Sequence, residues 1–409
     1  MTGMAGAPPL SVATIITRFS GGAGALALRG ILALDRDRYR PTIITGEPGG
    51  LGERARRAGV EVLVEQALRA PVAPRHDLLA LRRLTELLDH GGFDIVHTHC
   101  AKAGTLGRLA AARVGVPRVV HTYHGFPFHR FQSAARRMSY LAIERRMGRL
   151  TDLGLCVGAG VAAEAVRCGL LPADRVRTIG VVVDRGGPTR ADLDAVARAR
   201  HALGLRADAL VVGAVGRLTY QKAPEDFVAA LAILARIQPA LPGLVGVWIG
   251  GGELAGRVAR LAARTPEVPL VFAGERTDVM KLLPALNVFA LPSRYEGLPT
   301  AVVEAMVAGV PVVATDVNAV TDVVRPGHSG LLVPPQRPDL LAVAVRRLLD
   351  EPDLAARLAA NASALVSDRY HTIELRNALD SAYTSNPPTR VRPGGQPGNR
   401  AEGPAHLGL

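Results

Sequence analysis

The stretch Ser293–Met306 places two glutamates around a glycine and a proline, where a strand is expected to give way to a helix. We expect the strand to end at Leu291 and the helix to begin near Pro299, because proline is favoured at the first helical position. The free amides and the dipole at the start of such a helix favour a phosphate group. Helical side chains lean toward the N-terminus, so the Glu304 carboxylate is expected to point back at this site and bind ribose hydroxyls.

Glu296 lies on the loop before that helix and could bind a second set of hydroxyls. The E-x7-E spacing of Glu296 and Glu304 is common and is weak evidence by itself. The alternative is that Glu296 is a surface acid and that Glu304 balances the helix dipole. The order of strand, glycine-containing loop, proline and helix favours the binding interpretation.

Two cations, Arg217 and Lys222, follow the strand predicted at Leu210–Val215. Ligands of open α/β sheets bind at the C-terminal edge of the strands. Two positive charges at that edge could clamp a diphosphate and neutralise it as a leaving group. The alternative is a pair of solvated side chains, and the neighbouring acidic helix favours the clamp.

Two glycine-rich segments follow predicted strands. Gly250 opens a strand-to-helix turn that also satisfies the G-x-G-x-x-A dinucleotide pattern, so an NAD-dependent enzyme is one alternative. The match lies in the middle of the chain and lacks the acidic residue expected about 20 residues later, which favours a tight turn beside a nucleotide. Gly22, within Ser20–Gly24, would let the backbone approach a ligand across a cleft, although a simple tight turn explains it nearly as well.

Five of the eleven histidines cluster in one stretch, at positions 97, 99, 121, 124 and 129. His124 follows the strand predicted at Val119–Thr122 and precedes a glycine, so we expect it at the C-terminal edge of that strand. No His-Glu-x-x-His or Cys/His metal spacing is present, and no metal is expected. For His121 and His129 we favour a hydrogen-bonded structural role.

The length of 409 residues fits two α/β domains, and a hydrophobic content of 48% lets both bury apolar surface. One tryptophan and an aromatic content of 4% argue against stacking platforms for single-stranded nucleic acid. Three cysteines without a CxxC pair argue against disulfides or structural zinc and fit a reducing cytoplasm. No apolar run approaches the roughly 18 residues of a spanning helix, and the first residues do not read as a signal peptide, so any membrane contact is expected to be peripheral.

The net charge of +13 is concentrated in residues 1–185, which carry 26 Lys and Arg against 15 Asp and Glu. An anionic partner such as a phospholipid, a lipid phosphate or nucleic acid would explain this surplus, and so would an arginine-rich composition set by the genome. Residues 128–150 contain six arginines and one acid, Glu144, with Phe131, Met138 and Leu141 at helical spacing. This basic helix could rest on anionic lipid headgroups or bury its apolar side in the core, and both interpretations stay open.

Short β-branched runs alternate with helical patterns in both halves of the chain, which predicts parallel sheets built from βαβ units. We therefore expect an α/β protein with two Rossmann-like, doubly wound parallel-sheet domains. The expected divisions are an N-terminal domain over 1–185, a C-terminal domain over 186–371, a helix over 372–385 that closes the second domain, and a disordered tail over 386–409. A Gly-Gly-Pro stretch within 184–190 is the expected linker.

The chain resembles retaining glycosyltransferases of family 4, which have the GT-B fold, over nearly all of residues 10–383. The motifs that carry the resemblance are Glu296 and Glu304 with the Ala-Met-Val-Ala-Gly-Val-Pro run after them, Gly216 and Arg217 with Lys222, Phe272–Val279, Asp94–His99 with Lys102, and His121–His129. The segments Asp94–His99 with Lys102 and His121–His129 are similar to those of bacterial members that build capsular or extracellular polysaccharide. The chain departs from the family pattern at Ile179–Asp184 and around Gly158–Gly160, where a serine is often found.

The resemblance implies two domains that face each other across a cleft, with the acceptor bound by the N-terminal domain and the nucleotide sugar by the C-terminal domain. The donor-side roles that it implies are Arg217 and Lys222 at the pyrophosphate, Glu304 at the ribose, Glu296 at the transferred sugar, backbone near Arg276 at the base, and the amides of Gly297 and Leu298 at the sugar and phosphate. Gly22 and Gly250 would add their backbone to the donor site. His124 would lie at the reaction centre, with His99 and Lys102 on the acceptor side.

We therefore expect a metal-independent, retaining hexosyltransferase that moves a sugar from a nucleotide-diphosphate donor, a substrate and not a cofactor, to an acceptor hydroxyl. The favoured acceptor is a lipid-linked saccharide in cell-surface polysaccharide synthesis. The enzyme is expected in the cytoplasm, peripheral on the inner face of an anionic membrane, with no nucleic-acid partner. Transfer to a soluble natural product and a non-catalytic nucleotide-sugar-binding protein are the alternatives.

Overall fold

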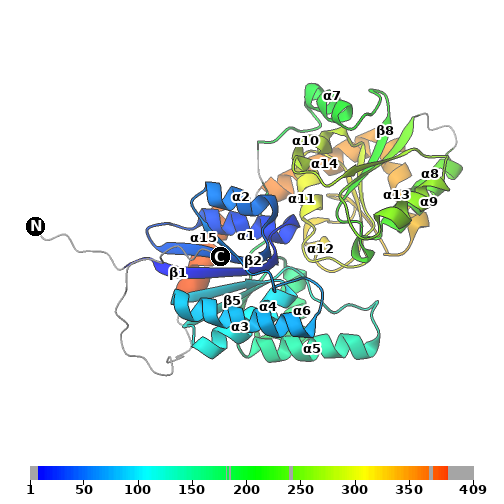
Figure 1. Ribbon diagram of the computed structural model, residues 1–409. Helices are drawn as coiled ribbons and strands as arrows, with labels where there is room; N and C mark the ends of the chain where they lie inside the picture. Colours follow the sequence, from blue (N-terminus) through cyan, green and yellow to red (C-terminus); the bar gives the residue numbers. More distant parts are fainter. Residues whose placement is uncertain (1–7, 181, 184–185, 239–242, 368–371, 386–409) are drawn as a thin grey trace, which may run out of the picture.

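The computed structural model describes residues 8–180, 182–183, 186–238, 243–367 and 372–385 of the chain. Within these residues the chain forms two parallel β-sheets, each flanked by helices (Figure 1). The expected fold class of two Rossmann-like parallel-sheet domains is confirmed. The tail expected to be disordered, 386–409, lies outside the described residues, as do positions 184–185 of the expected linker.

Within the described residues the first sheet has seven strands in the order β3-β2-β1-β4-β5-β6-β7. The strands are β1 (Leu10–Arg18), β2 (Tyr39–Glu47), β3 (Glu61–Val64), β4 (Ile95–His99), β5 (Arg118–Tyr123), β6 (Leu153–Cys156) and β7 (Val176–Thr178). The helices between them are α1 (Gly21–Ala33), α2 (Gly49–Arg57), α3 (Pro74–Gly91), α4 (Ala101–Val114), α5 (Ala134–Gly148) and α6 (Ala159–Arg167). Strands β4 and β5 are buried along their whole length although they carry His97, His99 and His121, so these side chains must find polar partners inside the domain.

The second sheet has six strands among the described residues, in the order β10-β9-β8-β11-β12-β13. They are β8 (Leu210–Val215), β9 (Leu244–Ile249), β10 (Leu270–Gly274), β11 (Val288–Leu291), β12 (Val312–Thr315) and β13 (Leu331–Val333). The helices of this part are α7 (Leu193–Ala202), α8 (Pro224–Ile237), α9 (Ala255–Ala263), α10 (Val279–Leu282), α11 (Thr300–Val307), α12 (Val320–Val323), α13 (Pro338–Asp350) and α14 (Pro352–Ser367). Strands β11 and β12 are apolar and fully buried, as expected of central parallel strands covered on both faces.

The last helix, α15 (Thr372–Thr384), packs against α1 and β5 of the first sheet (Figure 1). The Tyr39 hydroxyl donates to the Asp380 carboxylate at 2.7 Å, and the Arg118 Nε donates to the Ala382 carbonyl at 2.9 Å. A methyl group of Leu379 lies against Gly30, so that a Cβ atom at Gly30 would be 3.0 Å from it. The expectation that this helix closes the second domain is therefore wrong, because its apolar side is buried against the N-terminal domain.

Helix α5 is buried only at its C-terminal end, at Glu144, Met147 and Gly148. Met138, which one interpretation of the sequence placed in the core, is 68% exposed. That interpretation is wrong for Met138, because the helix runs past the edge of the domain before it reaches the core. None of the helices in the described part of the chain is long and apolar enough to cross a membrane.

Candidate active site

Loops from the C-terminal edges of the two sheets touch at Gly297 and His124. A Cβ atom at Gly297 would lie 1.9 Å from the His124 carbonyl oxygen, and one at Gly125 would lie 3.4 Å from the Gly297 amide nitrogen. No side chain fits at Gly297, so this glycine allows the loop before α11 to reach the loop after β5. The structure thereby brings together two predicted site segments that are more than 170 residues apart in the sequence.

The first turns of α1 and α11 also converge between the two sheets. Helix α11 begins at Thr300 with Pro299 as its N-cap residue, one position from the start that the sequence predicts. Gly22 lies in the first turn of α1, and a Cβ atom there would lie 3.0 Å from the Thr300 hydroxyl oxygen. Two helix N-termini with unsatisfied amides and positive dipole ends therefore face one small region, which favours an anionic ligand.

Glu296 is 6% exposed and is held by groups of its own domain. The Lys222 Nζ lies 2.5 Å from the Glu296 Oε1, and the Gln221 amide nitrogen lies 3.3 Å from the Oε2. The alternative that Glu296 is a solvated surface acid is wrong, because the carboxylate is buried. The two predicted site residues Lys222 and Glu296 form one ion pair, so each reduces the net charge that the other presents to a ligand.

Arg217 is exposed and makes no ion pair with any described residue. Burial raises the pKa of the Cys100 thiol to about 11, and the positive charge of Arg217 partly offsets this rise because it favours the thiolate. Because Cys100 caps α4 of the first domain, the guanidinium of Arg217 faces the junction between the domains. Its full charge is available to an anion there.

Gly250 supports the segment that carries Arg217. It has φ +139°, and a Cβ atom there would lie 2.1 Å from the Gly216 carbonyl oxygen. The same carbonyl accepts a hydrogen bond of 2.8 Å from the Trp248 indole nitrogen. The turn after β9 therefore packs directly against the backbone before Arg217, which agrees with the expected tight turn.

Three further predicted donor-side residues lie around these loops. Arg276, exposed after β10, is held by both oxygens of Asp278 at 2.8 Å each. Leu298 is buried, and Glu304 lies half-buried on α11. The functional roles expected for these residues stay predictions, since their positions alone do not identify a ligand.

His124, His99 and His97 form a chain of imidazoles that leads from the loop after β5 into the first domain. The His99 Nδ1 lies 2.9 Å from the His124 Nε2, and the rings of His97 and His99 are 4.3 Å apart. His97 is bonded to the Tyr383 hydroxyl at 2.8 Å and to the Thr122 hydroxyl at 2.7 Å. The orientation of His124 is thus fixed through His99, which was expected on the acceptor side, and through a residue of α15.

Burial lowers the pKa of every imidazole in this group. The pKa of His97 falls to about 3 and that of His124 to about 4, while the pKa of His99 lies well below its usual range. Neutral imidazoles avoid the cost of placing a charge in a site with little water. His124 is therefore neutral at physiological pH and has one donor and one acceptor nitrogen.

The two remaining clustered histidines have different roles. His121 is buried, its Nδ1 lies 2.8 Å from the Thr98 hydroxyl, and the expected structural role is confirmed. His129 is half-exposed and stacks on Tyr295 of the second domain, with ring centres 4.0 Å apart and an angle of 14°. It therefore contacts the opposite domain as well as its own.

Lys102 is held inside the first domain. Its Nζ lies 2.5 Å from the Asp77 Oδ1 and also donates to the Pro71 carbonyl. The side chain is 15% exposed. Its expected place on the acceptor side stays a prediction, and its amine is already shared by two partners at the start of α4.

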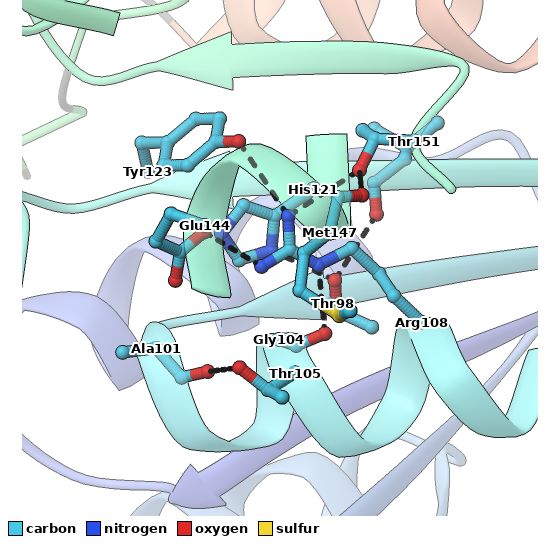
Figure 2. Close-up of polar contacts among 11 residues, drawn as sticks. Thr98, Ala101, Gly104, Thr105, Arg108, His121, Tyr123, Glu144, Met147 and Thr151 are labelled. Atoms are coloured by element: carbon cyan, nitrogen blue, oxygen red, sulfur yellow. Dashed lines mark hydrogen bonds and ion pairs between the residues drawn. The ribbon is translucent and has the colours of Figure 1, made fainter. Parts of the chain in front are cut away.

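A buried ion pair beneath the histidines joins α4 to α5 (Figure 2). Arg108 is 0% exposed, and its guanidinium lies 2.9 Å from the Glu144 carboxylate. It also donates to the Gly104 carbonyl at 2.7 Å and to the Thr151 hydroxyl at 3.3 Å. Glu144, the one acid of the basic segment 128–150, therefore serves the core. The sequence gives no signal for this pair, since a helical arginine ordinarily lies in solvent.

Gly158 and Gly160, at the start of α6, contact the second domain. Gly158 is the N-cap of α6, and a Cβ atom there would lie 2.5 Å from the Asp322 Oδ2. That carboxylate accepts a 2.9 Å hydrogen bond from the Gly160 amide, so the second domain caps a helix of the first. Asn318 adds a bond to the Glu164 carboxylate at 3.0 Å and accepts one from the Glu296 amide at 3.4 Å. The domain contact is therefore linked directly to the Glu296 loop.

Among the described residues no group of three or more His, Cys, Asp or Glu side chains is arranged to hold a metal ion. Arg217, Lys222 and the two helix N-termini contribute positive charge to this region.

The two parallel-sheet domains meet at the C-terminal ends of their strands, which is the architecture of the GT-B glycosyltransferases. The chain matches the family model for group 1 glycosyl transferases over residues 196–364 and that for glycosyltransferase family 4 over residues 20–185. It is 31% identical to the UDP-Gal:alpha-D-GlcNAc-diphosphoundecaprenol alpha-1,3-galactosyltransferase of Escherichia coli, over 67% of this chain and 71% of that protein. The chain therefore belongs to glycosyltransferase family 4.

Two other similarities agree with this assignment. The chain is 34% identical to the D-inositol 3-phosphate glycosyltransferase of Streptomyces scabiei, over 67% of this chain and 64% of that protein. Its fold matches that of HepE from Anabaena, whose crystal structure is in complex with UDP and glucose, with a TM-score of 0.77 at 20% identity. That match covers 92% of this chain and 100% of HepE.

Acidification is expected to destabilise the protein through its buried histidines. Below the ordinary imidazole pKa of about 6.5 the unfolded chain takes up protons that the folded chain excludes, so the free energy of unfolding falls by about 1.4 kcal/mol for each pH unit and each histidine. Urea unfolding between about pH 7.5 and about pH 5 measures this slope. His97→Gln should reduce this slope by the contribution of one histidine, about 1.4 kcal/mol for each pH unit. An unchanged slope would contradict the assignment of His97 as a neutral buried group.

Removing the interdomain cap should loosen the start of α6. Asp322→Ala is expected to speed hydrogen exchange at the Gly160 amide by roughly fivefold, because loss of a capping oxygen costs about 1 kcal/mol. Asp322→Asn keeps an oxygen acceptor and serves as the control. Equal exchange in all three proteins would mean that the Asp322 carboxylate does not cap α6 in solution.

Proposed function

We propose that this glycosyltransferase moves a sugar from a nucleoside diphosphate to an acceptor hydroxyl with retention of the anomeric configuration. The observation that carries the proposal is the convergence of Arg217, the Lys222–Glu296 pair and the N-termini of α1 and α11 at one junction. This arrangement can bind a diphosphate and stabilise the charge that develops when it leaves. The UDP-Gal in the name of the Escherichia coli enzyme and the UDP and glucose in the crystal structure of HepE support the same donor class.

In this proposal each donor-side residue binds a different part of the nucleotide sugar. Arg217 and Lys222 bind the pyrophosphate, Glu304 binds the ribose hydroxyls, and backbone near Arg276 contacts the base. Glu296 accepts hydrogen bonds from the transferred sugar, a role that suits a carboxylate held in place by its ion pair with Lys222. The amides of Gly297 and Leu298 point toward sugar and phosphate, while Gly22 and Gly250 give the backbone room to approach.

Retention follows in this proposal from attack on the face that the diphosphate leaves. The bond between the anomeric carbon and the diphosphate oxygen breaks, the acceptor oxygen bonds to that carbon, and the hydroxyl proton passes to the departing diphosphate. Protein groups supply the positive charge at the phosphate, so the proposed reaction uses no metal. Neutral His124 holds a sugar hydroxyl with one ring nitrogen while His99 occupies the other.

The proposed acceptor is a lipid-linked saccharide, like the GlcNAc-diphosphoundecaprenol in the name of the Escherichia coli relative. The exposed part of α5 supports a position at an anionic membrane surface in the cytoplasm, because it combines arginines with Met138 and Ile143, which are 68% and 44% exposed. Transfer to a soluble natural product and binding of a nucleotide sugar without catalysis are the competing functions. Release of free sugar or of glycosylated acceptor in a mass-spectrometric screen of nucleotide sugars separates catalysis from binding alone.

The donor site is tested most directly at Arg217. Arg217→Gln should weaken binding of UDP or of the preferred nucleoside diphosphate by roughly 10- to 100-fold, because a charge-assisted hydrogen bond contributes about 1.5–3 kcal/mol. Titration calorimetry measures the affinity. Arg257→Gln, a change of the same charge on exposed α9, is the control. Equal affinities for all three proteins would overturn the assignment of the phosphate site.

The membrane position predicts sedimentation with vesicles that contain phosphatidylglycerol. Met138→Ser should weaken this association by about tenfold, since burial of a methionine side chain contributes about 1.5–3 kcal/mol. Val343→Ser removes an apolar side chain of α13 that is 47% exposed and should leave the association unchanged. Failure of the unsubstituted protein to sediment with these vesicles would refute the membrane proposal without affecting the donor site.

A further inference from the structure

A cavity of about 610 Å³ lies between the two domains, next to the proposed reaction centre. Its N-terminal wall is formed by the loop after β5 and the start of α5, and its C-terminal wall by three separate loops of the second domain. The residues that line it include Phe126, His129, Arg136, Tyr220, Glu253 and Tyr295. The volume lies within the range of sites for small molecules.

The walls of this cavity are continuous with the proposed catalytic machinery. Tyr295 directly precedes Glu296, and Phe126 follows His124 by two positions. Tyr220 belongs to the same short helical turn as Lys222. The cavity is therefore lined by close neighbours in the chain of the residues that hold the transferred sugar in the proposed reaction.

We propose that this cavity is the acceptor site, and that it takes a saccharide whose anomeric oxygen carries a phosphate. The proposal rests on the proposed function, since it assigns the second substrate of that reaction. Three features carry it: aromatic walls on both domains, polar groups with unused hydrogen-bonding capacity, and one arginine without an acidic partner.

The aromatic walls suit a pyranose ring. Tyr295 stacks on His129 at 4.0 Å across the domain junction, and Tyr220 lies nearly parallel to His129 with centres 6.4 Å apart. Arg294 holds Tyr220 in place, with its guanidinium 4.4 Å from the ring centre and a 2.7 Å bond to the Tyr220 carbonyl. Aromatic side chains offer apolar surface at a small entropic cost, so they can pack on the C–H groups of a sugar.

Polar groups of the cavity can bind the sugar hydroxyls. The His129 Nδ1 is buried and has no hydrogen-bond partner among the described residues. Glu253 is exposed at the cavity wall, and its negative charge contributes to the raised pKa of Tyr295, after burial and the charge of Glu296. A buried polar atom without a partner is costly unless a ligand or water supplies one. These groups therefore favour a ligand rich in hydroxyls over an apolar one.

Arg136 supplies the charge for the phosphate. Its guanidinium lies 5.7 Å from the centre of the Tyr140 ring and 3.5 Å from the Tyr140 hydroxyl, and it forms no ion pair with a described residue. An arginine can bind phosphate oxygens with two parallel hydrogen bonds. Because Arg136 stands in the first turn of α5, the group beyond the phosphate would leave the cavity along the exposed part of that helix.

The test compares two probes on the protein saturated with UDP. One is undecyl α-GlcNAc diphosphate and the other is methyl α-GlcNAc, which lacks the phosphate. Arg136→Gln should weaken binding of the diphosphate probe by roughly 10- to 100-fold and leave the methyl glycoside unchanged, because only the first has charge-assisted hydrogen bonds to lose. Tyr295→Ala should weaken both probes, since it removes the ring on which the sugar packs.

Arg137→Gln is the matched control, because it removes the same charge from the neighbouring position of α5, which does not line the cavity. Equal effects of Arg136→Gln and Arg137→Gln would show general electrostatic attraction and overturn the proposal. So would a diphosphate probe that binds no better than the methyl glycoside to the unsubstituted protein. The affinity for UDP is measured in every variant, so loss of the donor site, which concerns the proposed function, is distinguished from loss of the acceptor site.

Discussion

The close approach of two backbones at the centre of the molecule is the constraint on which the site depends. Gly297 lies against the His124 carbonyl at a distance that excludes any side chain. This contact brings the end of β5 in one sheet to the end of β11 in the other. Because both sheets are parallel, the loops at their C-terminal edges carry the polar residues, and the contact brings these residues into one region. Glu296 and His124 come together for this reason.

The first domain holds His124 through polar groups that are taken out of water. His99 and His97 connect it to Tyr383, and the Arg108–Glu144 pair ties the neighbouring helices together below them. Such groups are costly to bury and are retained only where each has a partner. Burial keeps the imidazoles neutral, and the hydrogen bond between His99 and His124 occupies one ring nitrogen of His124, which leaves the other for a substrate.

Charge is distributed around the junction in an uneven way. Lys222 is already paired with Glu296, while Arg217 and the N-termini of α1 and α11 keep their positive potential. This difference favours a phosphate next to Arg217 and hydroxyl groups next to Glu296. Helix α5 has a comparable division, with Glu144 buried at one end and Met138 exposed near the other. One helix can thus stabilise the domain core and present a surface to a substrate or a lipid.

The sequence by itself determined the elements and their polarity, because strand and helix patterns, the Gly297 loop and the helix start at Pro299 depend on interactions between near neighbours in the chain. From these it predicted that Arg217, Glu296 and His124 follow strand ends. The tertiary structure decided the partners: Lys222 on Glu296, Asp322 at the start of α6, Arg108 with Glu144, and α15 against the first sheet. These contacts join residues separated by 36 to 341 positions, and only the packing of complete elements brings such residues within bonding distance. No local pattern distinguishes a buried arginine or a capping aspartate from a solvated one.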